Sequence, residues 1–266
     1  MRHRKTITAL VLIAAIILTV IALFLINRRY QTVIVSIPKF DVHPTTTSTP
    51  SVEPATTTPA SINPQPSSSV GASAKAETLN LPVPFTPQAP TGNWDQLHNE
   101  ACEEATALMA NAYYSGVKDV NLSPTYAEGQ ISKLVAWEDA NLGYDLDTTS
   151  AETAQMITQV YGLQTKLQND FTADDIKKEL SQNHLLIISE YGRALGNPNY
   201  KQPGPIHHML LIKGYDGNNL ITNDSGTKHG LNYIYSFDTI YSAAGDWSHV
   251  TNNVDQSKKI MIVVWK

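Results

Sequence analysis

The chain has 266 residues, of which 42% are hydrophobic and 16% charged, and its formal net charge is −5. Seven Lys/Arg and three Asp/Glu precede Leu79, so the remainder holds 12 basic and 21 acidic side chains and carries −9. Such a surface repels nucleic acid and anionic lipid, which argues against either as a partner of the folded part. A disulfide framework is excluded as well, because Cys102 is the only cysteine.

The first predicted element is a transmembrane helix over residues 6–26, TITALVLIAAIILTVIALFLI. These 21 residues carry no charge and would span roughly 30 Å as a helix. A cleaved signal peptide is the alternative, but its apolar region is usually about 7 to 15 residues long and ends in a small-residue cleavage site. This run is longer and ends in INRRY, which favours an uncleaved signal anchor.

Basic residues predict the orientation of this anchor. Arg2, Arg4 and Lys5 precede the apolar run, whereas two arginines follow it. Because cytoplasmic flanks are richer in Lys and Arg, we expect residues 1–5 to form a cytoplasmic tail. The chain is then a single-pass protein of the cell membrane, anchored through residues 6–26, with its C-terminal domain outside the cytoplasm.

Residues 27–78 are predicted to be a tether. Their core, PTTTSTPSVEPATTTPASINPQPSSSVGASAKAE, is rich in Pro, Ser and Thr and has no large apolar side chains to bury. Composition becomes globular from about Leu79, so residues 79–266 are expected to form one folded domain.

Apolar spacing and capping residues predict four helices at the start of this domain. The predicted helices are Glu100 to Ser115, closed by Gly116; Pro124 to about Ala140, capped by Ser123; a helix opened by the capping box Thr149-x-x-Glu152 and stopped by Gly162; and one that follows Thr172.

Short β-branched or aromatic runs predict strands later in the chain. They are HLLIISEY (184–191), HMLLIKGY (208–215), NLITND (219–224), NYIYSF (232–237) and KIMIVVW (259–265). Helices followed by strands indicate an α+β domain with a helix packed on an antiparallel sheet.

Cys102 is a candidate nucleophile in the stretch NEACEEATALM. At the start of a helix, unpaired backbone N–H groups favour the thiolate. Glu103 and Glu104 are ordinary helix-start residues whose charge opposes this effect, so a nearby histidine would have to do most of the activation. The alternative is a buried core cysteine, since Cys102 also lies on the apolar stripe of its helix.

Two of the eight histidines stand apart from the others. His207 and His208 begin the apolar run MLLI, where a buried strand starts. His98, His184, His229 and His249 lie in polar stretches and are expected to be exposed.

A predicted hairpin that follows His208 indicates which residue lies opposite it. Tyr215-Asp216-Gly217-Asn218 is a turn signal, and a turn centred near residues 216–217 would place His208 opposite Asp224 or Ser225 on the same face of the sheet. We therefore expect Asp224 to orient His208, with Asn223 as the alternative.

Two blocks of sequence together resemble a known family. VPFTPQAPTGNWDQLHNEACEEATALM (83–109) and HHMLLIKGYDGNNLITNDSGT (207–227) resemble the C39-like cysteine peptidases, in particular their stand-alone bacterial branch. The resemblance implies a papain-like fold for residues 79–266 without a cofactor or a metal. It also implies roles for four residues: Cys102 as nucleophile, His208 as general base and acid, Asp224 as its orienting partner and Gln88 in the oxyanion hole.

The chain departs from the family pattern at two places. Glu103-Glu104 replaces a common Gly-Pro pair after the cysteine, and Ser225 replaces a common Pro after the aspartate. Neither change removes a catalytic group. Trp94 and Trp247 are weaker candidates for lining a substrate cleft, and packed aromatics are the alternative for each.

The resulting hypothesis is a membrane-anchored extracytoplasmic cysteine peptidase that hydrolyses peptide bonds of a peptide or protein substrate, with cell-wall peptide as one candidate. One alternative is a catalytically inactive papain-like module that binds peptides or glycans at the envelope. Another is a cell-wall peptide amidase or transamidase that uses the same thiol chemistry.

Overall fold

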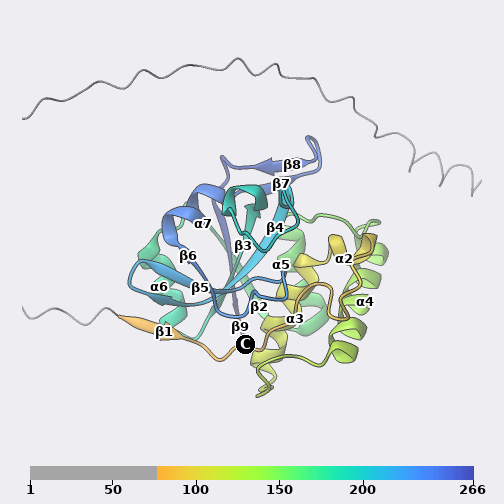
Figure 1. Cartoon of the computed structure of the whole chain (residues 1–266), viewed down its shortest axis with the longest axis horizontal. Coiled ribbons are helices and arrows are strands. Elements are labelled where there is room, and N and C mark those ends of the chain that lie inside the picture. The colour runs from red at the N-terminus through yellow and green to blue at the C-terminus, as the bar shows by residue number, and fades with distance from the viewer. Residues whose placement is uncertain (1–76) are drawn as a thin grey trace, which may run out of the picture. The chain divides into compact units, whose positions relative to one another are not determined.

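The computed structural model describes residues 77–266 (Figure 1). The predicted tail, the anchor over residues 6–26 and nearly all of the tether lie outside the described residues. Within residues 77–266, no helix combines the length and the hydropathy that crossing a bilayer requires.

An antiparallel sheet of seven strands is the centre of the domain. Its strands run in the order β2-β9-β3-β4-β5-β6, and β1 pairs with the end of β4. The bounds are β1 (Thr78–Asn80), β2 (Gln164–Asn169), β3 (Leu185–Tyr191), β4 (His207–Asp216), β5 (Asn219–Asn223), β6 (Tyr233–Ser236) and β9 (Ile260–Trp265). A separate pair is formed by β7 (Asp246–Ser248) and β8 (Asn253–Asp255).

Helices flank this sheet. Figure 1 shows α2 to α5 grouped together beside the sheet, whereas α6 and α7 lie at its other side. The bounds are α2 (Gln96–Asn99), α3 (Cys102–Tyr114), α4 (Pro124–Asn141), α5 (Ser150–Tyr161), α6 (Ala173–Ser181) and α7 (Phe237–Ala243), with a 3-10 turn η1 (Gly192–Leu195) after β3. The contact of α3 with β4 is the one that assembles the site described below.

The four predicted helices are confirmed, although the first begins at Cys102 rather than Glu100. The side chain of Ser123 accepts a hydrogen bond from Tyr126 N, and Thr149 forms a reciprocal capping box with Glu152. Gly162 ends α5 at φ 68°, a left-handed conformation that glycine adopts without steric cost. Local sequence is sufficient here because capping bonds join residues only three or four positions apart.

The central strands are buried on both faces. Every residue from Leu185 to Ile188 and from Met209 to Ile212 is inaccessible to solvent, as are their neighbours in β9. Burying one such side chain stabilises the fold by about 1.5–3 kcal/mol. Their continuous apolar runs, rather than alternating ones, follow from helices covering the sheet.

The α+β class with an antiparallel sheet is confirmed, although the simple order of helices followed by strands is incomplete. β2 precedes β3 and was not predicted, because its sequence QTKLQN is polar and its residues are exposed or only half-buried. As an edge strand it buries too little surface to require an apolar pattern. Two helices, α6 and α7, also lie among the strands in sequence.

Two buried carboxyl groups lie between α3 and α4. Burial and the charge of Glu138 raise the pKa of Glu104 well above its ordinary value. Burial, followed by the charge of Glu103, raises the pKa of Glu138 to about 8. The folded protein therefore holds protons here that the unfolded chain releases at lower pH.

This pair makes the free energy of unfolding depend on pH. Between pH 4.5, the ordinary value for Glu, and about 8, the folded state binds more protons than the unfolded state, so stability falls as pH rises. We expect the melting temperature of the full-length chain to fall across this window, and Glu138→Gln to make the fall shallower. The exposed Asp119 offers the control, because its charge acts on neither Glu104 nor Glu138, and Asp119→Asn should keep the wild-type slope. Equal slopes for Asp119→Asn and Glu138→Gln would contradict the prediction.

Candidate active site

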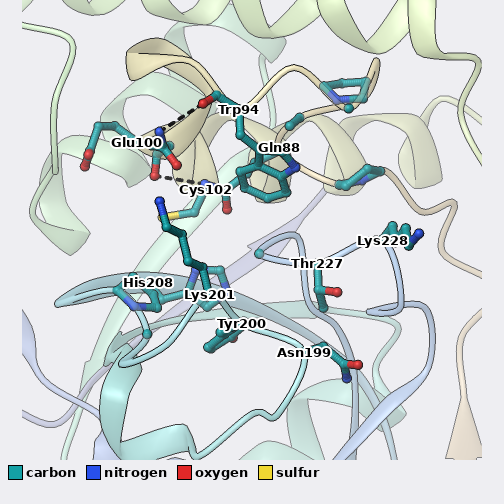
Figure 2. A pocket seen from close by; sticks show the side chains of 18 of the residues that line it. Gln88, Trp94, Glu100, Cys102, Asn199, Tyr200, Lys201, His208, Thr227 and Lys228 are labelled. Atoms are coloured by element: carbon teal, nitrogen blue, oxygen red, sulfur yellow. Dashed lines mark hydrogen bonds between the residues drawn. The ribbon is translucent and has the colours of Figure 1, made fainter.

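His208 and Asp224 form a buried pair at the start of β4. His208 Nε2 lies 2.9 Å from Asp224 Oδ1, and both side chains are almost inaccessible to solvent. Because an ionised carboxylate can only accept, Nε2 carries the proton of this bond and Nδ1 is left as the basic nitrogen. Figure 2 shows His208 and Tyr200 on one side of a cleft and Cys102, Gln88 and Trp94 on the other.

Asp224 is held by five hydrogen bonds in all. Oδ1 also accepts from the backbone N–H of Gly226 at 3.0 Å. Oδ2 accepts from Asn197 Nδ2 at 2.9 Å and from the hydroxyls of Tyr200 and Tyr235, each at 2.7 Å. Burial alone would raise the pKa of Asp224, but the charge of His208 and these bonds outweigh it and hold the pKa below its ordinary value.

The predicted pairing was correct in its contact and wrong in its register. Asp216 faces Asn219, so the turn residues are Gly217 and Asn218, and a bulge between Ile212 and Gly214 shifts the pairing again. The ladder ends at Asn223. Asp224 reaches His208 as the chain leaves β5, not as a directly opposed strand residue.

Asn223, the alternative partner, is engaged elsewhere. Its Nδ2 donates to the carbonyl oxygens of Val83 and Pro84, at 3.3 and 3.1 Å. It therefore ties the segment before Gln88 to the sheet, and the contact with His208 belongs to Asp224.

Cys102 is the first residue of α3, so it lies at the start of its helix as expected, although the helix itself was predicted to begin at Glu100. Its thiol is buried and donates a hydrogen bond to Glu103 Oε2 at 2.9 Å. Burial raises the pKa of the Cys102 thiol well above its ordinary value, and the charge of Glu103 and this hydrogen bond raise it further. At neutral pH the resting thiol therefore keeps its proton.

Glu103 and Glu104 are not solvated helix-start residues, which corrects the expectation from sequence. Only 1% and 2% of their surfaces are exposed. Glu103 Oε1 accepts from the backbone N–H of Thr148 at 2.9 Å while Oε2 accepts from the thiol. Glu103 enters the site because α3 packs its first turn inward against β4.

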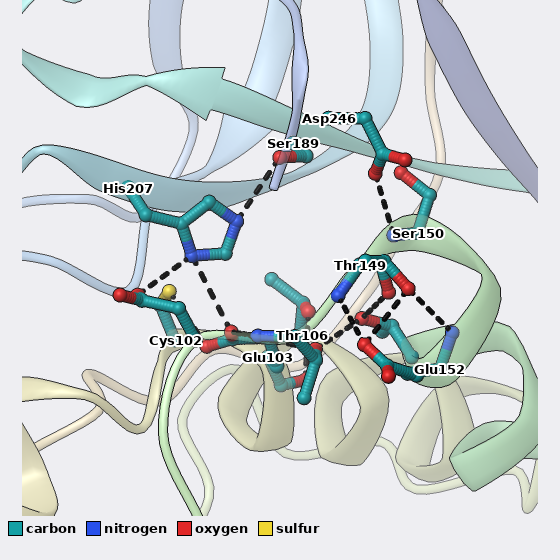
Figure 3. Close-up of polar contacts among 12 residues, drawn as sticks. Cys102, Glu103, Thr106, Thr149, Ser150, Glu152, Ser189, His207 and Asp246 are labelled. Atoms are coloured by element: carbon teal, nitrogen blue, oxygen red, sulfur yellow. Dashed lines mark hydrogen bonds and ion pairs between the residues drawn. The ribbon is translucent and has the colours of Figure 1, made fainter. Parts of the chain in front are cut away.

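His207 belongs to a network of its own on the Cys102 side of the cleft (Figure 3). Its Nδ1 lies 2.9 Å from Asp147 Oδ1 and 3.4 Å from Glu103 Oε1, while Nε2 lies 3.0 Å from Ser189 Oγ. Burial would lower the pKa of His207, but the charges of Glu103 and Asp147 outweigh it and raise the pKa. Ligand atoms of Cys102, Glu103 and His207 all lie within 4.8 Å of one another.

Gln88 lies buried just ahead of α3. Its Nε2 donates to the carbonyl oxygens of His98 and Asn99 at 2.9 and 3.0 Å, and no described residue donates to its Oε1. The backbone N–H of Gln88 donates to Ser225 O at 2.9 Å. Both hydrogens of the Gln88 side-chain amide thus bind the loop that leads to Cys102. An oxyanion in the cleft would compete with this loop for one of them.

The cleft has a volume of about 1190 Å³ and is lined by Cys102, His207 and His208 among others. Trp94, 45% exposed, lines it as predicted. Trp247 does not line it, because that ring packs against His207 with centroids 5.4 Å apart and is buried. Glu100 is another lining residue, and burial together with the charge of Asp147 raises its pKa to about 7.

A solitary cysteine at a helix start, across a cleft from a buried His–Asp pair in an α+β domain, is the arrangement expected of a cysteine peptidase. The model of the Peptidase_C39 like family matches residues 80–254, and the chain belongs to this family. The resemblance drawn from the two sequence blocks is thereby confirmed, and the family supports a peptidase of the hydrolase class.

A solved structure from Bacillus anthracis, provisionally assigned as a C39-like peptidase, aligns with a TM-score of 0.44 and 16% identity. The alignment covers 71% of this chain and 98% of that one. Among curated proteins, none matches the chain significantly.

Sequence reasoning missed the residues that surround the predicted ones. Asn197 and Tyr200 lie in the irregular segment between η1 and β4, where no periodicity relates them to Asp224. His98 was expected to be exposed, yet it is buried between Asp95 and Glu128, 2.7 Å from each. The separate surroundings of His207 could have been inferred from its position next to His208. Adjacent residues of a strand point to opposite faces of the sheet, so the two histidines must contact different residues.

Removing one hydrogen-bond donor from Asp224 should measurably lower the stability of the folded chain. Tyr235→Phe removes one donor from a buried carboxylate and should destabilise the chain by about 1.5–3 kcal/mol, measured by urea unfolding. Tyr233→Phe is the matched control, because its ring packs against Tyr235 at a tilt, with centroids 4.8 Å apart, and its hydroxyl bonds to no residue of the described domain. Equal effects of the two substitutions would mean that the bond to Asp224 contributes nothing.

Proposed function

We propose that the chain is a membrane-anchored extracytoplasmic cysteine peptidase with a papain-like fold that hydrolyses peptide bonds. The observation that carries the proposal is the His208–Asp224 pair. A carboxylate with five hydrogen bonds, two of them from buried tyrosines, holds one imidazole rigidly at a cleft that also contains the only cysteine. Membership of the Peptidase_C39 like family supports the same activity.

In the proposed mechanism His208 generates the nucleophile. Its Nδ1 takes the proton from the Cys102 thiol while Asp224 keeps Nε2 protonated and stabilises the imidazolium that forms. The thiolate sulfur then attacks the carbonyl carbon of the scissile bond. Because the resting thiol donates a hydrogen bond to Glu103, breaking this hydrogen bond is part of the first step.

The tetrahedral intermediate requires donors for its oxyanion. The backbone N–H of Cys102 lies in the first turn of α3, where N–H groups have no partner within the helix. Gln88 Nε2 is the proposed second donor and would exchange its bond to His98 O or Asn99 O for one to the oxyanion. Such a donor contributes about 2.7–4 kcal/mol to the transition state.

Collapse of the intermediate breaks the peptide bond. His208 returns its proton to the leaving amine, and the acyl group stays on the sulfur as a thioester. Water, deprotonated by His208, then hydrolyses the thioester and restores the thiol. Trp94, exposed at the rim of the cleft, is proposed to contact the bound peptide.

One observation favours a second function. The thiol of Cys102 is bonded to Glu103 and its pKa is raised, as expected of a cysteine that does not react. The corresponding candidate is an inactive module that binds peptides or glycans at the envelope in the same cleft. A cell-wall amidase or transamidase would use the proposed mechanism on peptidoglycan peptides, so only the substrate distinguishes it.

Covalent labelling distinguishes an active thiol from a buried one. We expect an electrophilic papain-type inhibitor to modify Cys102 of the purified full-length chain, and His208→Ala to slow the modification about 10²–10⁴-fold, the usual contribution of a positioned base. The exposed His229 also lines the cleft, and His229→Ala should label at the wild-type rate. Mass spectrometry of the modified peptide measures each rate.

Two outcomes would count against the peptidase. Labelling at equal rates in wild type and His208→Ala would remove His208 from the mechanism. A folded chain that neither labels nor turns over peptide libraries or peptidoglycan fractions would instead support the binding module.

The proposed topology has its own test. Protease added to intact cells should cut within residues 27–78 and release the folded domain, because that segment is proposed to lie outside the membrane. Immunoblotting for a C-terminal epitope measures the release, and a cytoplasmic marker should stay intact. Protection of the epitope would reverse the orientation.

A further inference from the structure

We propose that Cys102, Glu103, His207 and Asp147 form a binding site for one divalent ion such as Zn²⁺. The bound ion reversibly blocks the thiol. Binding of the ion stands on the geometry of these residues alone. Only its consequence, inhibition, rests on the proposed peptidase function.

The four side chains converge from different parts of the chain. Cys102 Sγ is 2.9 Å from Glu103 Oε2, and Glu103 Oε1 is 3.4 Å from His207 Nδ1. The same Nδ1 is 2.9 Å from Asp147 Oδ1. One ligand atom from each of Cys102, Glu103 and His207 lies within 4.8 Å of the other two.

These separations suit one small ion. Zinc binds thiolate sulfur, imidazole nitrogen and carboxylate oxygen at about 2.0–2.3 Å, and in a tetrahedron the ligands are then about 3.3–3.8 Å apart. The separations of 2.9 and 3.4 Å lie just below and within this range, and no two of the ligand atoms of Cys102, Glu103 and His207 are more than 4.8 Å apart. Rotation of side chains by a few tenths of an ångström to about 1 Å would therefore close the set around an ion.

The surrounding bonds are those that orient metal ligands in proteins. His207 Nε2 pairs with the buried Ser189 Oγ at 3.0 Å, which fixes the imidazole with Nδ1 facing the cluster. Glu103 Oε1 accepts from Thr148 N at 2.9 Å, which holds the carboxylate in place. Such partners of the ligands typically contribute 10–100-fold to metal affinity.

Charge favours a cation at this point. The carboxyl groups of Glu100, Glu103 and Asp147 lie around His207, so like charges repel one another at this point. A divalent ion would relieve this repulsion. As the ion binds, the thiol proton and the proton that His207 Nδ1 donates to Asp147 both pass to water, while Nε2 keeps its proton toward Ser189 Oγ. The thiolate thereby gains a partner stronger than its hydrogen bond to Glu103.

The ion has a route to the cluster. Cys102, Asp147 and His207 all line the cleft of about 1190 Å³. A sulfur whose lone pair binds a metal cannot attack a carbonyl carbon. Metal availability outside the cell would then switch the proposed peptidase between a blocked state and a free state.

Cobalt spectroscopy tests the site in the wild-type full-length chain. Co²⁺ should bind with 1:1 stoichiometry and produce the near-ultraviolet charge-transfer band of a thiolate–cobalt bond, which Zn²⁺ should remove by competition. Zn²⁺ should also protect Cys102 from alkylation, and a chelator should restore its reactivity. Absence of the band at saturating Co²⁺ would overturn the proposal without reference to any variant.

Substitutions locate the ion. Cys102→Ser, Glu103→Gln and His207→Gln should each lower Zn²⁺ affinity about 100-fold or more, since losing a ligand costs at least as much as losing its orienting partner. His249→Gln is the matched control, because His249 also pairs with a carboxylate, Glu152 at 2.9 Å, at the surface. Unchanged affinity in the folded cluster variants would overturn the proposal.

The two proposals fail separately. Metal binding with no labelling or turnover of the chelator-treated chain would refute the peptidase and leave the metal site standing. Labelling and turnover without metal binding would refute the metal site alone.

Discussion

The packing of α3 against β4 is the contact on which the site depends. It brings residues 102–103, at the start of a helix, against residues 207–208, at the start of a central strand, although about 100 positions separate them in sequence. Both elements are held by fully buried apolar side chains, so sliding one past the other would expose core surface. The position of the thiol relative to both histidines therefore follows from core packing rather than from a flexible loop.

Cys102 lies between two polar environments of opposite effect. On the His207 side, Glu103 accepts a hydrogen bond from the thiol, and burial raises the pKa of the thiol. On the His208 side, the charge of His208 and the hydrogen bonds to Asp224 outweigh burial and keep the pKa of Asp224 low, so the imidazole has a fixed basic nitrogen. One side stabilises a resting or metal-bound sulfur, and the other is suited to proton transfer.

Much of the fold was predictable because its signals are local. The caps of α4, α5 and α6 join residues three positions apart, and the apolar runs of β3, β4 and β9 show directly that these strands are buried. The edge strand β2 was not predictable, since its side chains are mostly exposed. The hairpin register failed because the turn residues are Gly217 and Asn218, one position later than the predicted centre. The bulge near Lys213 changes the pairing again and leaves no signature in the residues beside the turn.

Sequence by itself determined the class of the domain, the candidate residues Gln88, Cys102, His208 and Asp224, and, through two blocks of motif, the family. Tertiary structure decided what surrounds each of them. The burial of Glu103, the hydroxyls on Asp224 and the second histidine network arise from contacts across α3, the η1–β4 segment and β4. Such long-range contacts depend on how separate elements pack, and no local periodicity encodes them.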